Sequence, residues 1–230
     1  MLDADIKFEF EPDVRRAEAI DLRMQRELGQ SLSYIREHCL GVLPFDDTSL
    51  LRVIARLNDG KPVAPSVFAA YYELVLAISD DDESSVREKL DEITSATEIV
   101  EGIETVILGD PCLGANNDRF IEMMSGDAGD DPDLEIGFTT PAKDVAEAFR
   151  DRLTEGFALL DKAIPDLAGE IRNIIRLVVI AGSDLTKKMQ FDGGSHFQLW
   201  GALFLNANFH PDRIAVAEVL AHETAHSLLF

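Results

Sequence analysis

Two of the five histidines in this 230-residue chain, His222 and His226, are four residues apart near its end. They bound the segment His222-Glu223-Thr224-Ala225-His226. Residues four apart in an α-helix lie above one another on the same face, so both imidazoles can point at one ion. Neutral imidazoles bind zinc and iron well. We therefore predict that His222 and His226 are metal ligands.

Glu223 follows the first histidine and is rotated from it by about 100° around a helix axis. This rotation places its carboxylate beside an ion held by the two histidines rather than between them. In zinc hydrolases with this motif, the glutamate is a general base that activates a water molecule. We predict that Glu223 is the catalytic carboxylate.

Two imidazoles do not complete a metal site, because structural and catalytic centres use at least a third protein ligand. Metalloproteases with this motif supply that ligand downstream, whereas this sequence stops at Phe230. Three alternatives stay open: the ligand lies upstream, the sequence is a truncated form of a longer protein, or another chain supplies the ligand. The upstream candidates are Glu218, His196, His210 and Asp212.

The motif must be positioned by a helix, which the apolar spacing predicts from Arg213 to about Leu229. Asp212 or His210 is its expected N-cap, with Pro211 near the first turn. A strand is expected before it over residues 197–206, where apolar residues occupy both alternating faces. A strand that is apolar on both faces is covered on both.

The rest of the pattern is mainly helical, and the first half is expected to be all-helical. Glycine- and aspartate-rich residues 125–133 are typical of a surface loop, and their spacing does not fit a twelve-residue calcium loop. Residues 177–180 either finish a helix or begin a strand. The expected helices cover residues 11–43, 47–60, 67–78, 84–101, 140–163 and 166 onward.

The predicted fold class is therefore α+β and predominantly helical, with a zincin-like strand followed by the HExxH helix at the C-terminus. We place a lobe boundary at the loop of residues 125–133. Residues 1–138 form an expected helical N-terminal lobe, and residues 139–230 an expected metal-binding lobe. A leader-peptide or substrate-docking role for the first lobe is a hypothesis based on its acidity.

The formal net charge of −22 excludes nucleic acids and anionic membranes as expected partners, and it favours a basic peptide.

With 46% hydrophobic residues, the chain can bury a substantial core. Cys39 and Cys112 are too few and too far apart for a disulfide framework or a cysteine zinc site. Without a secretory signal or a long apolar run, the expected location is cytoplasmic.

The C-terminal segment resembles the HExxH-motif family of peptide-modification proteins, over residues 140–230. The residues that carry the resemblance are Leu159-Leu160, Ile164-Pro165, Ile171, Ile174-Ile175, Val178-Val179, Gly194-Ser195, Trp200-Gly201-Ala202-Leu203-Phe204-Leu205 and Glu218 to Leu229. Members of this family are described as iron(II)- and 2-oxoglutarate-dependent peptide β-hydroxylases, found near ribosomally made, modified peptides.

The resemblance implies that His222 and His226 hold Fe(II), with Glu223 as the motif carboxylate and 2-oxoglutarate as cosubstrate. Two histidines and a carboxylate on one side of Fe(II) leave positions for 2-oxoglutarate and dioxygen. Members of the family continue past the motif, so any cosubstrate-binding residues that lie there have no counterpart in this sequence.

Three functions compete. The first is Fe(II)- and 2-oxoglutarate-dependent β-hydroxylation of a ribosomally synthesised peptide, as the resemblance implies. The second is a zinc metallopeptidase, because a HExxH helix after an edge strand is the zincin arrangement. The third is a non-catalytic peptide-binding protein with an incomplete metal site, because no downstream ligand is present.

Overall fold

The computed structural model describes residues 11–96, 100–125 and 136–229. The chain divides into two compact units. Residues 18–101 form one, here called the helical unit, and residues 1–17 with 102–230 form the other, here called the sheet unit. The loop of residues 125–133, on which the predicted lobe boundary depends, lies almost entirely outside the described residues.

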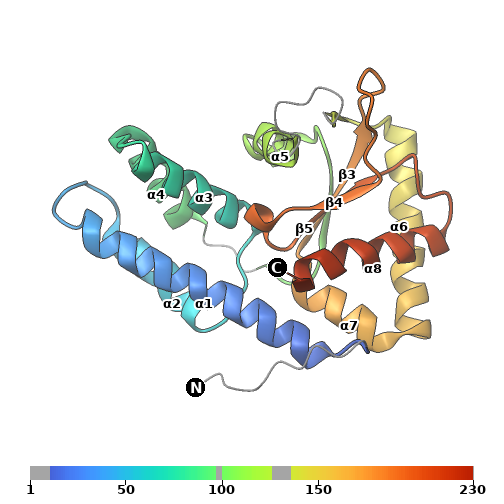
Figure 1. Cartoon of the computed structure of the whole chain (residues 1–230), viewed down its shortest axis with the longest axis horizontal. Coiled ribbons are helices and arrows are strands. Elements are labelled where there is room, and N and C mark those ends of the chain that lie inside the picture. The colour runs from blue at the N-terminus through green and yellow to red at the C-terminus, as the bar shows by residue number, and fades with distance from the viewer. Residues whose placement is uncertain (1–10, 97–99, 126–135, 230) are drawn as a thin grey trace. The chain divides into compact units, whose positions relative to one another are not determined.

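The helical unit consists of helices (Figure 1). These helices are amphipathic and bury leucine and isoleucine side chains. Leu50 and Leu57 of α2, Leu74 of α3 and Leu90 of α4 are completely buried. Pro65 occupies the first turn of α3, where its missing N–H costs no helical hydrogen bond. The helices are α1 (Val14–Cys39, whose first residues belong to the sheet unit), α2 (Asp47–Asn58), α3 (Pro65–Ser79) and α4 (Glu83–Ser95).

The N-terminus of α4 is capped by Asp82, whose Oδ1 accepts hydrogen bonds from the backbone N–H groups of Ser84 and Ser85, both at 3.1 Å. The Ser85 hydroxyl also donates to Asp82 Oδ2 at 2.7 Å. These bonds, the hydroxyl foremost, hold the pKa of Asp82 below its ordinary value.

Because the folded-state pKa is lowered, the stability from this cap is present at neutral pH and is lost as the pH falls through the folded pKa. We expect Asp82→Ala to lower the urea midpoint of the helical unit at pH 7, and to lower it much less at a pH below the folded-state pKa of Asp82. Circular dichroism at both pH values measures this difference. Asp82→Asn keeps a neutral capping oxygen, so its midpoint should fall less than that of Asp82→Ala at pH 7. An equal gap between wild type and Asp82→Ala at both pH values would contradict the prediction.

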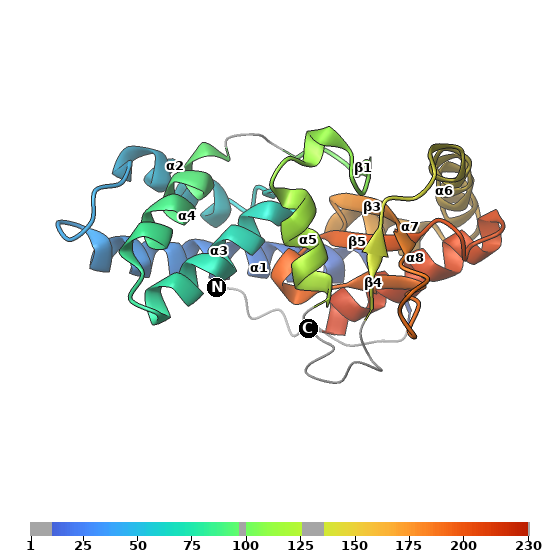
Figure 2. The same cartoon turned by 90° about the horizontal axis from the view of Figure 1, so that it is seen from above.

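The sheet unit is built on a small mixed sheet, whose strands are labelled in Figure 2. The strand order is β1-β3-β5-β4, with β1, β3 and β5 parallel and β4 antiparallel to β5. β2 pairs antiparallel with the end of β3. The strands are β1 (Glu104–Ile107), β2 (Phe138–Thr139), β3 (Leu177–Ser183), β4 (Gly193–Ser195) and β5 (Ala202–Asn206).

Helices cover both faces of this sheet (Figures 1 and 2). On one face, Phe120 of α5 meets Phe204 of β5 edge-on, with ring centroids 5.8 Å apart. α6 and α8 pack on the other face, where Gly156 of α6 lets the helix approach Val216 of α8. The helices are α5 (Asn116–Ser125), α6 (Lys143–Ala163), α7 (Pro165–Ile174) and α8 (Arg213–Leu229), with short 3-10 turns at Pro111–Leu113 and Phe197–Leu199.

The α+β, mainly helical fold class is confirmed, and the ambiguous residues 177–180 belong to strand β3. Two expectations were wrong. The first half is not all-helical, because residues 104–107 form β1. The strand expected over 197–206 begins only at Ala202, because Gly201 has a φ of +87°, which breaks extended backbone. Within the described residues, no helix is both long and apolar enough to cross a bilayer.

Asn206 ends β5 and is completely buried. Its Nδ2 donates to Ser183 Oγ at 2.7 Å and to the Phe191 carbonyl at 2.8 Å. Its Oδ1 accepts from the backbone N–H of Asn208 at 3.0 Å. The side chain therefore ties the ends of β3 and β5 to the backbone that leads into β4.

We expect Asn206→Ala to lower the free energy of unfolding by about 2–3 kcal/mol, because it leaves the Phe191 carbonyl buried without this donor. Chemical denaturation followed by circular dichroism measures the change. Asn208→Ala, at an exposed position, is the matched control and should cost less than about 0.5 kcal/mol. Equal costs for the two variants would refute this role for Asn206.

Candidate metal centre

The motif residues are carried by α8, which follows β5 after a short turn. Asp212 caps the helix: its Oδ1 accepts from the backbone N–H groups of Ile214 at 2.8 Å and Ala215 at 3.0 Å. The same bonds, the one from Ala215 foremost, hold the pKa of Asp212 below its ordinary value. Of the two N-caps that the sequence allowed, Asp212 is therefore the one that forms.

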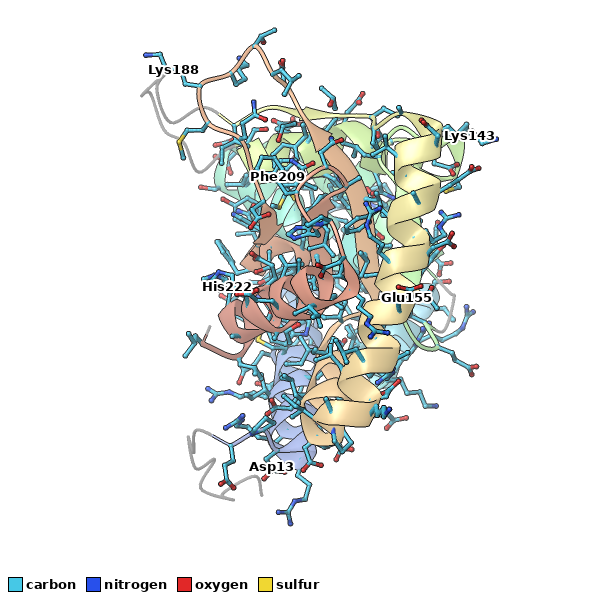
Figure 3. The ribbon with its side chains drawn as sticks, turned by 90° about the vertical axis from the view of Figure 1, so that its right-hand side faces the viewer. Asp13, Lys143, Glu155, Lys188, Phe209 and His222 are labelled. Atoms are coloured by element: carbon cyan, nitrogen blue, oxygen red, sulfur yellow. The ribbon has the colours of Figure 1, made fainter. Side chains whose placement is uncertain are left out.

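The helix is turned so that the histidines and the glutamate lie in different surroundings. The His222 side chain is 66% exposed, whereas that of Glu223 is 8% exposed. In Figure 3, His222 lies at the edge of the view on α8, on the side opposite to Glu155 of α6. This difference follows from the helical period. Val216, Val219 and Leu220 pack in the core, and Glu223 lies on the same buried face of α8 whereas the histidines do not.

The two imidazoles converge. His222 Nε2 and His226 Nε2 are 3.2 Å apart, and the ring planes are nearly perpendicular at 86°. Two nitrogens held at about 2.0–2.1 Å by one tetrahedral zinc are about 3.3 Å apart. Adjacent positions on an octahedral iron place them about 3.0 Å apart. The measured separation thus matches the requirement of a single ion and does not distinguish the two metals.

Glu223 completes a group of one carboxylate and two imidazoles whose ligand atoms all lie within 4.8 Å of one another. Its Oε1 is 4.0 Å from His222 Nε2. An oxygen sharing an ion with that nitrogen would be about 3.0–3.4 Å from it. The carboxylate therefore stands beside the ion position, and it would have to move by about 1 Å to become a ligand.

The surroundings of Glu223 disfavour its charge. Burial raises the pKa of Glu223 above its ordinary value, while His222 and His226 oppose this effect and Asp192 adds to it. On its buried side lies β4: a Cβ added at Gly193 would be 2.9 Å from both Cγ and Oε1 of Glu223. The Ser195 hydroxyl donates to the Glu223 carbonyl at 3.3 Å.

None of the four upstream residues considered as third ligand belongs to this group within the described part of the chain. Asp212 is the helix cap, ten residues before His222. His210 is buried, and its Nε2 donates to the carbonyl of Asp192 at 3.1 Å. His196 is buried and accepts at Nδ1 from the backbone N–H of Gln198. Glu218 is exposed one turn before His222.

Strand β4 was not expected from the sequence, although its residues Gly193 and Gly194 lie directly against the motif helix. Glycine weakens a strand but permits close backbone approach. The pair of glycines before Ser195 was therefore the available signal. It marks the place where the backbone passes directly against Glu223.

The described residues also form a cavity of about 490 Å³ elsewhere in the sheet unit, between β1 and α6. None of the three residues of the metal group lines it. Arg172 at its rim is already held by Asp161 through two hydrogen bonds, of 2.6 and 2.8 Å. The cavity is thus separate from the chemistry of α8.

The donor set fits a divalent transition metal: two imidazole nitrogens at the separation one ion requires, with a carboxylate close by. His222 and His226 would hold the ion, and Glu223 would face it. A scan against known protein families and a search of curated proteins found no match to the chain.

Proposed function

We propose that the chain is a metal-dependent enzyme that modifies peptides, with His222 and His226 as metal ligands. The observation that carries this proposal is the 3.2 Å separation of the two Nε2 atoms beside a buried carboxylate. Two neutral imidazoles at this separation can share one N–H···N hydrogen bond, and an ion between them would instead bind both nitrogens. The peptide as substrate rests on the resemblance to the HExxH peptide-modification family.

For the reaction, we propose Fe(II)- and 2-oxoglutarate-dependent β-hydroxylation. When bound, iron with 2-oxoglutarate and dioxygen supplies the oxidising chemistry. The group has the two histidines and one carboxylate of such iron sites, and Glu223 would complete this ligand set after a movement of about 1 Å. In this reaction His222 and His226 would hold the ion at the surface of α8. Glu223 would orient the substrate that approaches the ion.

A zinc metallopeptidase is the second candidate, and the placing of Glu223 favours it. The carboxylate stands beside the ion position rather than at ligand distance, as a general base does. The edge position of β4 and its antiparallel direction next to α8 also suit a zincin-like arrangement. In this reaction Glu223 would take a proton from the attacking water and pass it to the leaving amine.

Metal analysis of purified protein, joined to two activity assays, tests both candidates. Bound iron with conversion of 2-oxoglutarate to succinate supports the hydroxylase. Bound zinc with peptide cleavage that disappears in Glu223→Gln supports the peptidase. Protein that retains neither metal, after incubation with each, would refute the proposal and leave a non-catalytic peptide-binding role.

A further inference from the structure

The cavity between β1 and α6 is bounded by one side of the helix and by an outermost strand of the sheet. Its volume of about 490 Å³ falls within the range of about 300–1,000 Å³ that is typical of sites for small ligands. The α6 residues that line the cavity recur at three- and four-residue intervals, so they share one side of the helix. These residues are Arg150, Leu153, Thr154, Phe157, Ala158 and Asp161.

The floor of the cavity is apolar. Leu153 is 3% exposed, and Ile103 and Phe157 are half-buried. The guanidinium of Arg172 lies over the Phe157 ring, with its Cζ 5.4 Å from the ring centroid. Two hydrogen bonds to Asp161, of 2.6 and 2.8 Å, hold that guanidinium in place. The cavity therefore offers an ordered apolar wall against which a flat ring can pack.

Arg150 supplies the cavity with a positive charge that no bonded carboxylate neutralises. Among the described residues, its guanidinium has no hydrogen bond or ion pair, whereas that of Arg172 is paired with Asp161. The nearby Asp110 accepts from the backbone N–H of Cys112 at 3.0 Å. This bond is the main cause that lowers the pKa of Asp110, and the charge of Arg150 adds to it without a bond. The Arg150 donors are thus available to a ligand.

The outer edge of β1 adds further donors to the same cavity. The N–H groups of Glu104 and Leu108 donate to the carbonyls of Arg176 and Ile180, both at 2.9 Å, so these residues face β3. Orientation alternates along a strand, so the N–H of Thr105 points away from β3. No strand within the described ranges pairs with this edge. The Thr105 side chain also lines the cavity, which places its hydroxyl there as well.

We propose that this cavity binds a small aromatic carboxylate, with its ring against Phe157 and its carboxylate held by Arg150 and by the N–H and hydroxyl of Thr105. A guanidinium matches a planar carboxylate through two parallel N–H groups. A single unpaired guanidinium suits a single negative charge, which a protein of net charge −22 otherwise repels. The residues of the metal group do not line the cavity, so the proposal is independent of the proposed function.

2-Naphthoate is the probe, because Arg150 and Phe157 are about 10 Å apart along α6 and two fused rings with a carboxylate approach that length. Isothermal titration calorimetry should show saturable binding of 2-naphthoate to the full chain. Naphthalene-2-methanol keeps the rings but has no charge, so it should bind at least about tenfold more weakly. In a nitrogen–proton NMR spectrum, 2-naphthoate should shift the amide resonance of Thr105.

Arg150→Gln removes the charge at an exposed position of α6 and should weaken the binding of 2-naphthoate at least about tenfold. Lys143→Gln is the matched control, because it removes one positive charge from the same helix outside the cavity lining. This control should bind as wild type does. Ala158→Phe fills the cavity from an exposed position and should abolish binding. An unchanged circular dichroism spectrum shows that each variant is folded.

No saturable binding of 2-naphthoate to wild-type protein would overturn the proposal, and so would binding that Arg150→Gln and Ala158→Phe leave unchanged. Equal binding of naphthalene-2-methanol would do so as well, because the site would then not recognise a carboxylate. His222→Ala should bind 2-naphthoate as wild type does. A loss of binding in that variant would place the ligand at the metal centre and would refute the assignment to the cavity.

Discussion

His222→Ala and His226→Ala should each weaken the binding of Zn²⁺ and Fe²⁺ by about a hundredfold or more. Binding of zinc to a complete four-ligand site is worth about 10–16 kcal/mol, so one ligand contributes about 2.5–4 kcal/mol. Among the described residues, the metal group consists of His222, Glu223 and His226. No further described side chain of this group can therefore take the place of a removed imidazole. Competition titration against a chelating dye measures the affinity.

His38→Ala is the matched control, because it also removes an imidazole from a helix surface. His38 lies in the helical unit, where its Nδ1 bonds to the Tyr34 carbonyl at 2.8 Å. This variant should bind metal as wild type does. Full metal binding by both His222→Ala and His226→Ala would remove the basis of the proposed centre.

Glu223→Gln extends the same experiment to the third member of the group. Because Oε1 is 4.0 Å from His222 Nε2, we expect metal affinity to change by less than about tenfold. Turnover should nevertheless disappear, because the amide cannot carry the proton or charge of a carboxylate. A loss of affinity as large as that of His222→Ala would instead identify Glu223 as a ligand.

Sequence could predict the parts of the site that follow from local periodicity. The four-residue spacing of His222 and His226 predicts one helix face, and the same period turns Glu223 into the core. The capping aspartate of α8 is local as well, because Asp212 bonds to N–H groups two and three residues later. These features depend on a few consecutive residues.

The missed features depend on residues far apart in sequence. Gly193, Gly194 and Ser195 have little strand preference, and they form β4 because β5 offers them an edge. The short β1 likewise exists through its pairing with β3, seventy-three residues later at Glu104 and Leu177. Gly201 looked like one more residue of an apolar strand until its positive φ showed a turn. Tertiary partners decide such segments.

The close approach of β4 to α8 leads to the last prediction. A Cβ at Gly193 would lie 2.8 Å from Val219 Cγ2 and 2.9 Å from Glu223 Cγ and Oε1. Real Cβ atoms essentially never come so close, so Gly193→Ala must displace the carboxylate or the strand. A displacement of about 1 Å at a catalytic group costs about a hundredfold in rate. We expect that loss in turnover, while the two histidines keep their metal affinity within about tenfold.

Gly194→Ala provides the comparison on the same strand. Among the residues that the structure describes, its Cβ would meet only the terminal Cε of Met124, a flexible side-chain end on the opposite face of the sheet. This variant should keep turnover within a few-fold of wild type, since Met124 can rotate away. Adding Val219→Ala to Gly193→Ala removes one of the two clashes. If the double variant stays impaired, the contact with Glu223 causes the loss. Full recovery would show that the contact with Val219, not the contact with Glu223, causes the loss.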